Sequence, residues 1–357
     1  MEMITKGHSS PTRAVLAALG LSMLSAMQTV SAQESTVLYG RVAGGIDYVT
    51  GAGSTHYGSN QWGTSLWGLR GSEDLGGGFH AQVHLESAFS SGDGKLGDTL
   101  FSRYSVVGLS NPLFGTVWFG RAMALPDGDV WAIDPMGLQV TGAPTLQRNR
   151  SWGPRDKVIT YESPDAGAWS FRAQARPNDR TAGGTSGRLL AGSVTYRNEV
   201  LLAKGIYEEI RDGAGRFSSL YGASRLYSVG AVYGTGRLKS FAGYSRIRSG
   251  KETAADGDNP TGATEQRTYW LGANYRVTDV LMLQGGAYRA VANREGACAT
   301  LVAAGVIYQF SKKTLLYGTL GNLGNGRNAT FSVEDNGPKP SAGTGQRNFY
   351  IGIVQHF

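Results

Sequence analysis

The sequence lacks the features that usually stabilise a soluble exported protein or mark a helical membrane protein. It has a single cysteine, Cys298, so no intrachain disulfide can form. It has no run of 18 consecutive apolar residues, which argues against a transmembrane helix. After the N-terminal segment, no linker, charge block or break in composition divides the chain, and apolar residues at helical spacing are scarce. These absences predict one domain built from β-strands.

The N-terminal segment has the pattern of a secretory signal peptide, predicted to cover residues 1–32. A basic segment precedes a mostly apolar stretch, residues 14–27, that is too short to span a bilayer, and Val30-Ser31-Ala32 then offers a small-x-small cleavage site. The alternative is a short buried helix. The segment holds two of the 34 basic and one of the 27 acidic residues, so the remaining domain, 33–357, carries 32 against 26, a net charge of +6.

The sequence is rich in glycine, 53 of 357 residues, and in alternating apolar and polar side chains. The clearest predicted strand spans residues 79–89, where Phe79, Val83 and Leu85 share one face and His84 and Glu86 share the other. A period of two with one polar face is typical of a half-buried strand. No helix follows that could cover the apolar face, and lipid is its natural cover. The modest mean hydropathy of −0.23 agrees, because a barrel strand exposes only alternate residues to lipid.

The connections between predicted strands alternate between short turns and long polar loops. Seven short turns, with both termini at the same end, predict a 16-stranded antiparallel transmembrane β-barrel with short periplasmic turns and long outer loops. Aromatic residues near strand ends, among them Tyr48, Trp169, Tyr233 and Tyr275, fit the girdles found at membrane interfaces. The rival architecture is a secreted soluble β-sandwich or propeller.

Several segments in order along the chain resemble the trimeric general diffusion porins of β-proteobacteria. The most specific is Trp67-Gly68-Leu69-Arg70-Gly71-Ser72-Glu73-Asp74-Leu75-Gly76-Gly77-Gly78, and others lie at 36–48, 107–121, 161–164 and 352–357. The resemblance implies a homotrimer and a third loop, residues 122–154, folded into the lumen. It also implies that Phe357 is the C-terminal signal read by the barrel-assembly machinery. The chain departs from the family where Leu66 and Val354 replace basic residues, which puts selectivity in question.

Strand parity and the position of the third loop give a candidate pore constriction. The predicted basic wall comprises Arg41, Arg70, Arg103, Arg148, Arg150, Arg155 and Arg172. The predicted acidic side comprises Glu86, Asp127, Asp129 and Asp134. Charges on opposite walls of a narrow channel focus the field that acts on a passing ion. The two strand histidines, His80 and His84, lie about 13 Å apart, too far to share a metal ion.

The sequence therefore predicts an outer-membrane porin that lets small hydrophilic solutes diffuse passively, with a weak to moderate preference for anions. We expect no enzymatic activity, cofactor, metal or nucleic-acid partner. The expected partners are two further copies of the chain, outer-membrane lipid and lipopolysaccharide. Three alternatives remain: a substrate-specific channel for small carboxylates, a secreted soluble adhesin or binding module, and an outer-membrane enzyme.

Overall fold

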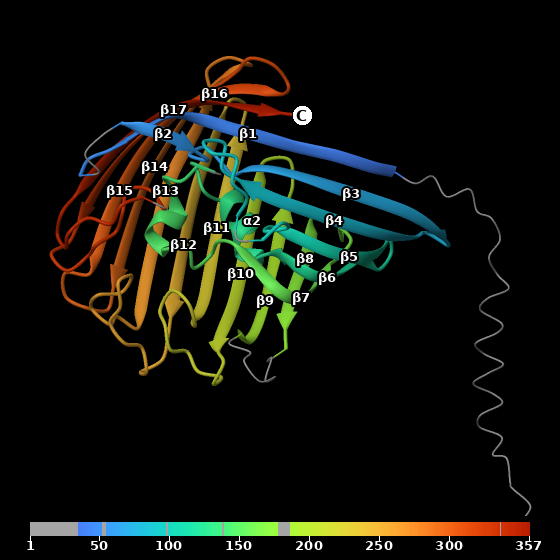
Figure 1. Ribbon diagram of the computed structural model, residues 1–357, viewed down its shortest axis with the longest axis horizontal. Coiled ribbons are helices and arrows are strands. Elements are labelled where there is room, and N and C mark those ends of the chain that lie inside the picture. Colours follow the sequence, from blue (N-terminus) through green and yellow to red (C-terminus); the bar gives the residue numbers. More distant parts are fainter. Residues whose placement is uncertain (1–34, 52–54, 98, 138, 178–185, 336) are drawn as a thin grey trace, which may run out of the picture.

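The chain forms a closed β-barrel in the computed structural model (Figure 1), which describes residues 35–357 except 52–54, 98, 138, 178–185 and 336. The predicted signal peptide at 1–32 lies outside these residues. The first half of the barrel is formed by β1 (Ser35–Val49), β3 (Ser65–Gly76), β4 (Phe79–Phe89), β5 (Tyr104–Asn111), β6 (Gly115–Met123), β7 (Pro154–Glu162), β8 (Trp169–Arg176) and β9 (Ser186–Arg197). The second half is formed by β10 (Leu201–Asp212), β11 (Arg225–Thr235), β12 (Leu238–Arg248), β13 (Glu265–Arg276), β14 (Leu281–Ala292), β15 (Cys298–Gln309), β16 (Thr314–Asn325) and β17 (Gln346–His356).

The ring closes because β1 pairs antiparallel with both β3 and β17. The prediction of sixteen strands is thus confirmed; a further short strand, β2 (His56–Ser59), pairs with β1 outside the ring. Short turns join the strands at one end and long loops at the other. In the first turn Gly76, Gly77 and Gly78 have φ values of +80°, +61° and +79°, a left-handed conformation that favours glycine. In the described part of the chain, no helix is long and apolar enough to cross a membrane.

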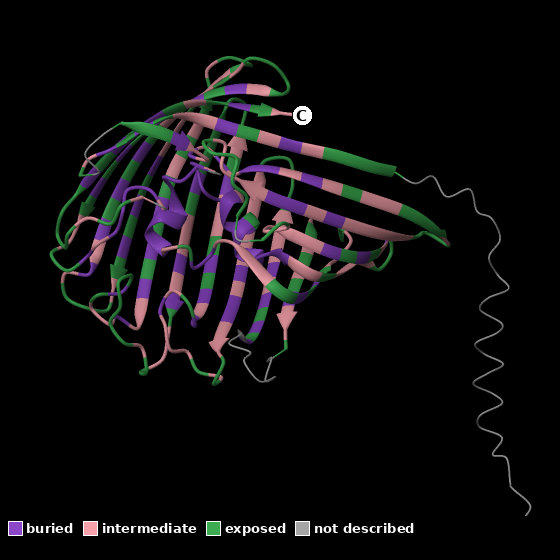
Figure 2. Ribbon diagram, viewed as in Figure 1, coloured by how far each residue is buried: buried purple, intermediate pink, exposed green. Residues whose placement is uncertain are grey.

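Burial alternates along the strands in the way the sequence predicts (Figure 2). On the outer wall Val229, Leu271 and Ile351 are exposed, at 55%, 67% and 49%. Their strand neighbours point into the barrel, where Ser228, Trp270 and Tyr350 are buried. A belt of exposed aliphatic and aromatic side chains is what a strand presents to lipid, so the barrel has the surface of an integral membrane protein.

The lumen is partly filled by the third loop, which runs between β6 and β7. It begins with a short helix, α2 (Leu125–Ala132), and continues to a 3₁₀ helix, η1 (Ala143–Gln147). Both lie inside the barrel wall (Figure 1). The largest apolar core of the protein therefore lies between this loop and the inner wall.

Candidate functional site

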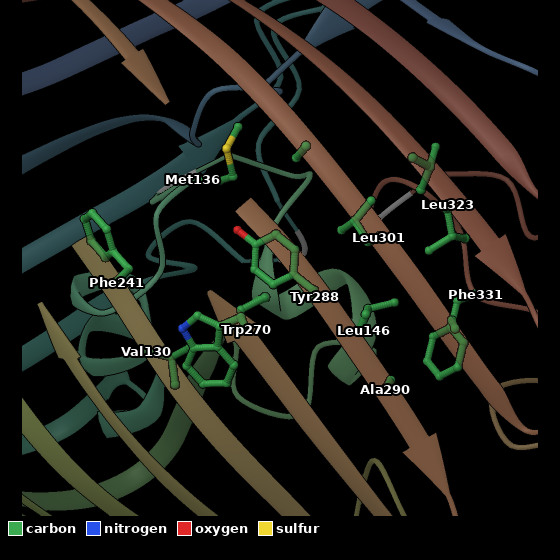
Figure 3. Close-up of a cluster of buried hydrophobic side chains, with 14 of the residues drawn as sticks. Val130, Met136, Leu146, Phe241, Trp270, Tyr288, Ala290, Leu301, Leu323 and Phe331 are labelled. Carbon is green, nitrogen blue, oxygen red and sulfur yellow. The ribbon is translucent and has the colours of Figure 1, made fainter. Parts of the chain in front are cut away.

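The third loop packs against only one side of the barrel. Val130, Met136 and Leu146 from the loop meet Trp270 and Tyr288 from the inner wall (Figure 3). Hydrogen bonds fix the contact, because the Trp270 indole donates to the Ile133 carbonyl at 2.8 Å and Gln266 Nε2 donates to the Leu146 carbonyl at 2.6 Å. The loop thus fills the part of the lumen beside β11–β16.

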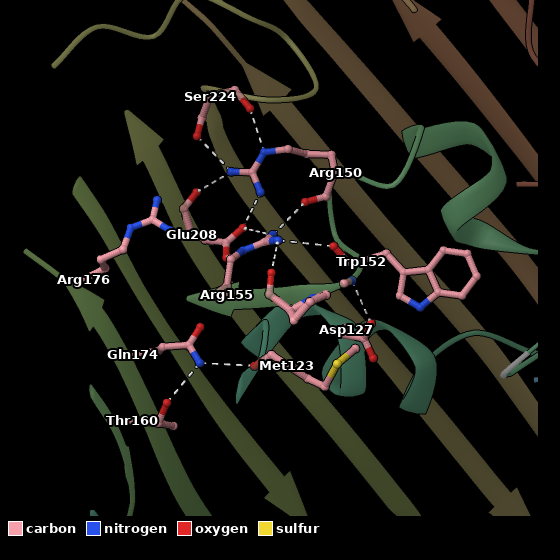
Figure 4. Close-up of polar contacts among 12 residues, drawn as sticks. Met123, Asp127, Arg150, Trp152, Arg155, Thr160, Gln174, Arg176, Glu208 and Ser224 are labelled. Atoms are coloured by element: carbon pink, nitrogen blue, oxygen red, sulfur yellow. Dashed lines mark hydrogen bonds and ion pairs between the residues drawn. The ribbon is translucent and has the colours of Figure 1, made fainter. Parts of the chain in front are cut away.

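A buried charge cluster anchors the end of the loop (Figure 4). Arg150 is fully buried and pairs with Glu208 of β10, while its Nε donates to Ser224 Oγ at 2.7 Å. Arg155 at the start of β7 makes two bonds to the same carboxylate, at 3.1 and 3.2 Å. One carboxylate therefore holds two guanidinium groups in place, which leaves one positive charge in the cluster, and both arginines act on the position of the loop.

Two cavities occupy the other side of the lumen, and both are lined by Met123 at the end of β6. The inner cavity, about 460 Å³, lies towards the short turns and is lined by residues of β1 and β3–β8. The outer cavity, about 580 Å³, lies towards the long loops and is lined partly by the last loop, between β16 and β17. The open space of the barrel thus follows the wall that the third loop does not cover.

Arginines dominate the charged lining of this space. Arg70 and Arg172 line the inner cavity, and Arg103 and Arg121 line the outer one. The guanidinium of Arg70 lies 4.8 Å from the centre of the Tyr39 ring. The guanidinium of Arg41 donates a hydrogen bond to the Thr64 carbonyl at 2.7 Å and lies 5.7 Å from the centre of the Trp62 ring. Among the described residues no carboxylate lies within 4 Å of Arg41 or Arg70, so these two keep uncompensated charge.

A wide barrel narrowed by an inward loop and lined by charge is the architecture of a diffusion channel, and comparison with known proteins decides the family. The family model described as Gram-negative porin matches residues 14–328. The chain belongs to the Gram-negative porin family. It is 28% identical to an outer membrane porin protein of Delftia acidovorans, over 95% of this chain and 99% of that protein.

Solved structures show the same barrel. An anion-selective porin from Comamonas acidovorans superposes with a TM-score of 0.76 at 24% identity, covering 91% of this chain and 100% of the other. Salmonella typhi OmpF gives a TM-score of 0.65 at 15% identity, covering 90% of this chain and 97% of the other. The protein is thus an outer-membrane porin, and the predicted fold, family and location are confirmed. Its relatives in the family are channels rather than enzymes.

The predicted basic wall of this porin separates into two groups. Arg70, Arg103 and Arg172 line the open side of the lumen, and Arg41 adjoins it through its hydrogen bond to Thr64, which lines the outer cavity. Arg150 and Arg155 form the buried loop anchor. Arg148 lies at the outer end of the third loop, where its Nη2 donates to Thr330 Oγ1 at 2.8 Å and it stacks 4.5 Å from the Phe331 ring centre. It therefore ties the third loop to the last loop.

The predicted acidic side is likewise engaged in local contacts. Asp129 pairs with Arg172 at 2.6 Å and with Lys204 at 2.5 Å. Burial alone would raise the pKa of Asp129, but these two cations outweigh it and hold the pKa below its ordinary value. Asp127 accepts from the Gly153 amide at 3.1 Å, and burial raises its pKa to about 6.

The other two predicted acids lie at opposite ends of the site. Asp134 accepts from the Tyr288 hydroxyl at 2.6 Å within the loop core, and burial raises its pKa to about 7. Glu86 of β4 lies on the arginine side, where it accepts from Arg103 Nε at 2.6 Å and from the Tyr39 hydroxyl at 2.6 Å. The structure thus brings Glu86 together with the arginines and not with the third-loop acids.

Sequence reasoning missed two residues that position the third loop, Lys204 and Glu208 on β10. Both face the lumen, since Lys204 reaches Asp129 and Glu208 reaches Arg150. Lys204 and Glu208 stand at alternate positions with the buried Ile206, and this alternation could have placed both side chains in the lumen. Leu66, the position at which the resemblance led us to expect a basic residue, faces the lumen, pairs with Arg41 on the neighbouring strand and is 7% exposed. The arginine side is therefore interrupted by an apolar residue.

Proposed function

We propose that this porin passes small hydrophilic anions in preference to cations, and the unpaired guanidinium groups of Arg41 and Arg70 carry the proposal. Four arginines line the two cavities, against the carboxyl groups of Glu162, Asp47 and Glu334. Burial, with the nearby Asp47, raises the pKa of Glu334 to about 8, which keeps this group largely neutral at pH 7. Because Arg103, Arg121 and Arg172 pair with Glu86, Asp156 and Asp129, the positive charge that remains unpaired beside the open path is that of Arg41 and Arg70. Positive charge at a constriction attracts anions and repels cations.

The third loop adds little negative charge to oppose this. Asp129 is neutralised by Arg172 and Lys204, and Asp134 is buried against Tyr288. In addition, the Comamonas acidovorans porin, whose fold matches this chain, is described as anion-selective. We infer a weak to moderate preference, because Leu66 removes one possible charge from the wall.

The test is the reversal potential of purified protein in a planar bilayer under a KCl gradient. Wild-type channels should reverse on the side that indicates chloride preference, and Arg70→Ala should reduce the chloride-to-potassium permeability ratio. Unit charges about 4 Å apart in water interact by about 1 kcal/mol, so the loss of one guanidinium should change the ratio by up to about fivefold. Arg289→Ala, on the outer wall of β14, is the matched control. Potassium preference in the wild type would refute the proposal.

We propose further that the porin is a homotrimer held through the outer wall around β1 and β17. There Leu38, Ile46 and Ile351 are exposed at 63%, 55% and 49%, beside the small residues Gly40 and Gly44. One similar structure, of an OmpT protein, is described as a trimer form. Channel closures in groups of three would support the trimer. By resemblance, the terminal Phe357 serves as the assembly signal, and lipopolysaccharide surrounds the outer wall.

A narrower role, as a channel for small carboxylates, is supported by the lining of the inner cavity. Arg70 and Arg172 lie there beside the apolar Val106, Trp118 and Leu125. Such a mixture suits an organic anion, because the guanidinium groups meet the carboxylate and the apolar groups meet its carbon chain. Flux of a small dicarboxylate that saturates with concentration would favour this role over general diffusion, whereas a linear dependence would exclude it.

A further inference from the structure

An apolar patch lies inside the lumen, on the wall that the third loop does not cover. Val106 of β5, Ala122 of β6 and Val158 of β7 form its buried base, and the rings of Tyr104 and Trp118 pack against this base. Both rings also line the inner cavity. A channel wall that only has to keep water around a passing ion does not need such a surface. Contiguous apolar surface with a polar rim is instead typical of a binding site.

Trp118 turns one face of its indole towards the cavity. The opposite face lies over Gly108 of the neighbouring strand, because a Cβ added to Gly108 would fall 2.5 Å from Trp118 Cε3 and 2.9 Å from Trp118 Cδ2. At the edge of the ring, Nε1 donates a hydrogen bond to Glu162 Oε2 at 3.2 Å, which fixes the orientation of the indole. The ring is thus held against the wall in a position where a second ring could stack on it.

An unpaired positive charge lies in the same cavity. Among the described residues no carboxylate is within 4 Å of Arg70, whereas Arg172, the other arginine of the inner cavity, pairs with Asp129 at 2.6 Å. Arg70 pairs with His84 across β3 and β4, and His84 pairs with Val106 across β4 and β5. Two strand spacings, about 10 Å, therefore separate the backbone of Arg70 from the edge of the apolar patch. A single small molecule can reach both.

The guanidinium of Arg70 is held in place by a series of rings that begins at the patch. The Tyr104 ring stacks on the His84 imidazole, with centres 4.3 Å apart and an angle of 19° between the planes. His84 Nε2 lies 2.5 Å from the Tyr39 hydroxyl, and the Tyr39 ring faces the Arg70 guanidinium at 4.8 Å. Because the guanidinium is already positioned, a carboxylate that binds it costs little side-chain entropy.

The Trp118 end of the cavity is unfavourable for a second negative charge. The Glu162 carboxylate lies at the edge of the indole, and Arg172, 4.0 Å away from it, is already bound to Asp129. A ligand carboxylate at this end would meet the charge of Glu162, and like charges at close range repel. The cavity is therefore suited to a molecule with one charged end and one apolar end.

We propose that the inner cavity binds small aromatic monocarboxylates, with the carboxylate on Arg70 and the ring on Trp118. This inference rests on the proposed anion preference and narrows the proposed carboxylate role to one class of substrate. Guanidinium groups hold carboxylates through charge-assisted hydrogen bonds, and ring stacking adds to the affinity. The cavity volume of about 460 Å³ lies within the usual range of small-molecule sites.

The test is the block of chloride current by benzoate, measured on the purified porin in a planar bilayer at pH 7. Two ligand controls are used: benzamide, which has the ring without the charge, and terephthalate, which carries a second carboxylate opposite the first. The variants Trp118→Leu and Trp118→Phe both lose the hydrogen bond to Glu162 and differ only in whether a ring remains. Trp169→Leu, on the exposed outer wall of β8, is the matched control for loss of a tryptophan. Heat-modifiable gel mobility shows that each variant is folded.

The half-blocking concentration of benzoate should rise about threefold to tenfold in Trp118→Leu, the contribution of an aromatic pair, and should stay within about twofold of the wild type in Trp118→Phe and Trp169→Leu. Arg70→Gln, a second variant, should raise it at least about tenfold, the loss of a charge-assisted hydrogen bond. Benzamide should not block the wild type. Terephthalate should block it less strongly than benzoate does, and Glu162→Gln should reduce that difference.

Equal block of the wild type and Trp118→Leu would overturn the proposal, and so would block by benzamide as strong as that by benzoate. The reversal potential, measured in the same membranes before benzoate is added, separates the two possible failures. Potassium preference refutes the proposed anion preference, whereas chloride preference without benzoate block refutes the aromatic site alone.

Discussion

Glu208 is the residue on which the position of the third loop depends most directly. Its carboxylate is fully buried and pairs with both Arg150 and Arg155. Removing one partner of a buried ion pair leaves uncompensated charge and costs about 3–5 kcal/mol. We therefore expect Glu208→Gln to lower the free energy of unfolding by that amount and to increase the open-channel current noise, because the loop loses its anchor. Denaturant unfolding and bilayer recording measure the two effects.

The matched control is Glu265→Gln on the outer wall, which also pairs with two arginines but is partly exposed. Exposed ion pairs contribute roughly 0–1 kcal/mol, so this variant should unfold almost like the wild type and conduct without added noise. If the two variants were equally stable, Glu208 would not be the anchor.

At the same scale, strand parity predicted more of the site than loop composition did. Parity placed Arg70 and Arg172 towards the lumen, where they line the inner cavity, because a strand allows only two side-chain directions. Strand parity does not predict which charged side chains will pair across the lumen. Arg150 and Asp129 are bound by Glu208 and Lys204, residues more than 50 positions away in the sequence. Those pairings depend on the path of the third loop, which no periodic pattern encodes.

At the scale of elements, the last loop is the one whose position should respond to pH. Glu334 lies beside Asp47 of β1 and accepts from Asn348 Nδ2 at 2.6 Å, while the Asp335 amide donates to the Val140 carbonyl of the third loop at 3.0 Å. Burial raises the pKa of both carboxyl groups to about 8. The imidazole of His56 lies 3.3 Å from Asp47.

A raised carboxyl pKa means that the folded loop binds protons more tightly than the free loop does. The resulting stability is fully present below the ordinary pKa of 4.5 for Glu334 and is lost as the pH rises towards 8. We expect hydrogen exchange of residues 331–335, corrected for intrinsic rates, to lose at least about tenfold in protection between pH 6 and pH 9, the effect of one pKa unit.

The double variant Glu334→Gln/Asp335→Asn should remove most of this pH dependence, because an amide does not titrate, whereas Glu334→Gln alone should leave the part that comes from Asp335. The exchange of β12, which three strands separate from β16 in the barrel, provides the internal control. Protection that stays constant or increases as the pH rises would contradict the assigned burial of these carboxyl groups.

At the scale of the whole molecule, alternation of turns and loops was enough to predict the number of strands. Each hairpin is marked by a turn sequence that can be recognised locally, as in the three consecutive glycines that begin at the last residue of β3. The seam between β1 and β17 could not be derived this way, because it joins the two ends of the chain. In the structure Tyr48 lies opposite Phe349 and Arg41 opposite His356. Resemblance to a family known to close in this manner supplied the expectation.

The seam also contains a glycine, Gly40, on which closure of the barrel should depend. A Cβ on Gly40 would overlap Phe357 Cζ and would lie 2.7 Å from the Leu66 carbonyl oxygen, closer than atoms can approach. The backbone of Gly40 exchanges hydrogen bonds of 3.0 and 3.3 Å with that of Phe357, so the backbone on both sides of the contact is fixed, and the Leu66 carbonyl cannot move aside as the half-exposed ring can. Gly40→Ala should therefore destabilise the barrel by about 1–3 kcal/mol, the usual cost of overpacking.

The measurement is denaturant unfolding in lipid vesicles, with heat-modifiable gel mobility as the indicator of a closed barrel. Gly285→Ala is the matched control, because its added Cβ would lie 3.9 Å from the nearest atom, the Ala303 carbonyl oxygen. A double-mutant cycle with Phe357→Ala separates the two sources of strain. If the aromatic ring is the main obstacle, Gly40→Ala costs less in the Phe357→Ala background. If its cost is undiminished there, the Leu66 carbonyl limits the seam, and if Gly40→Ala costs nothing in either background, the contact at the seam is looser than these distances imply.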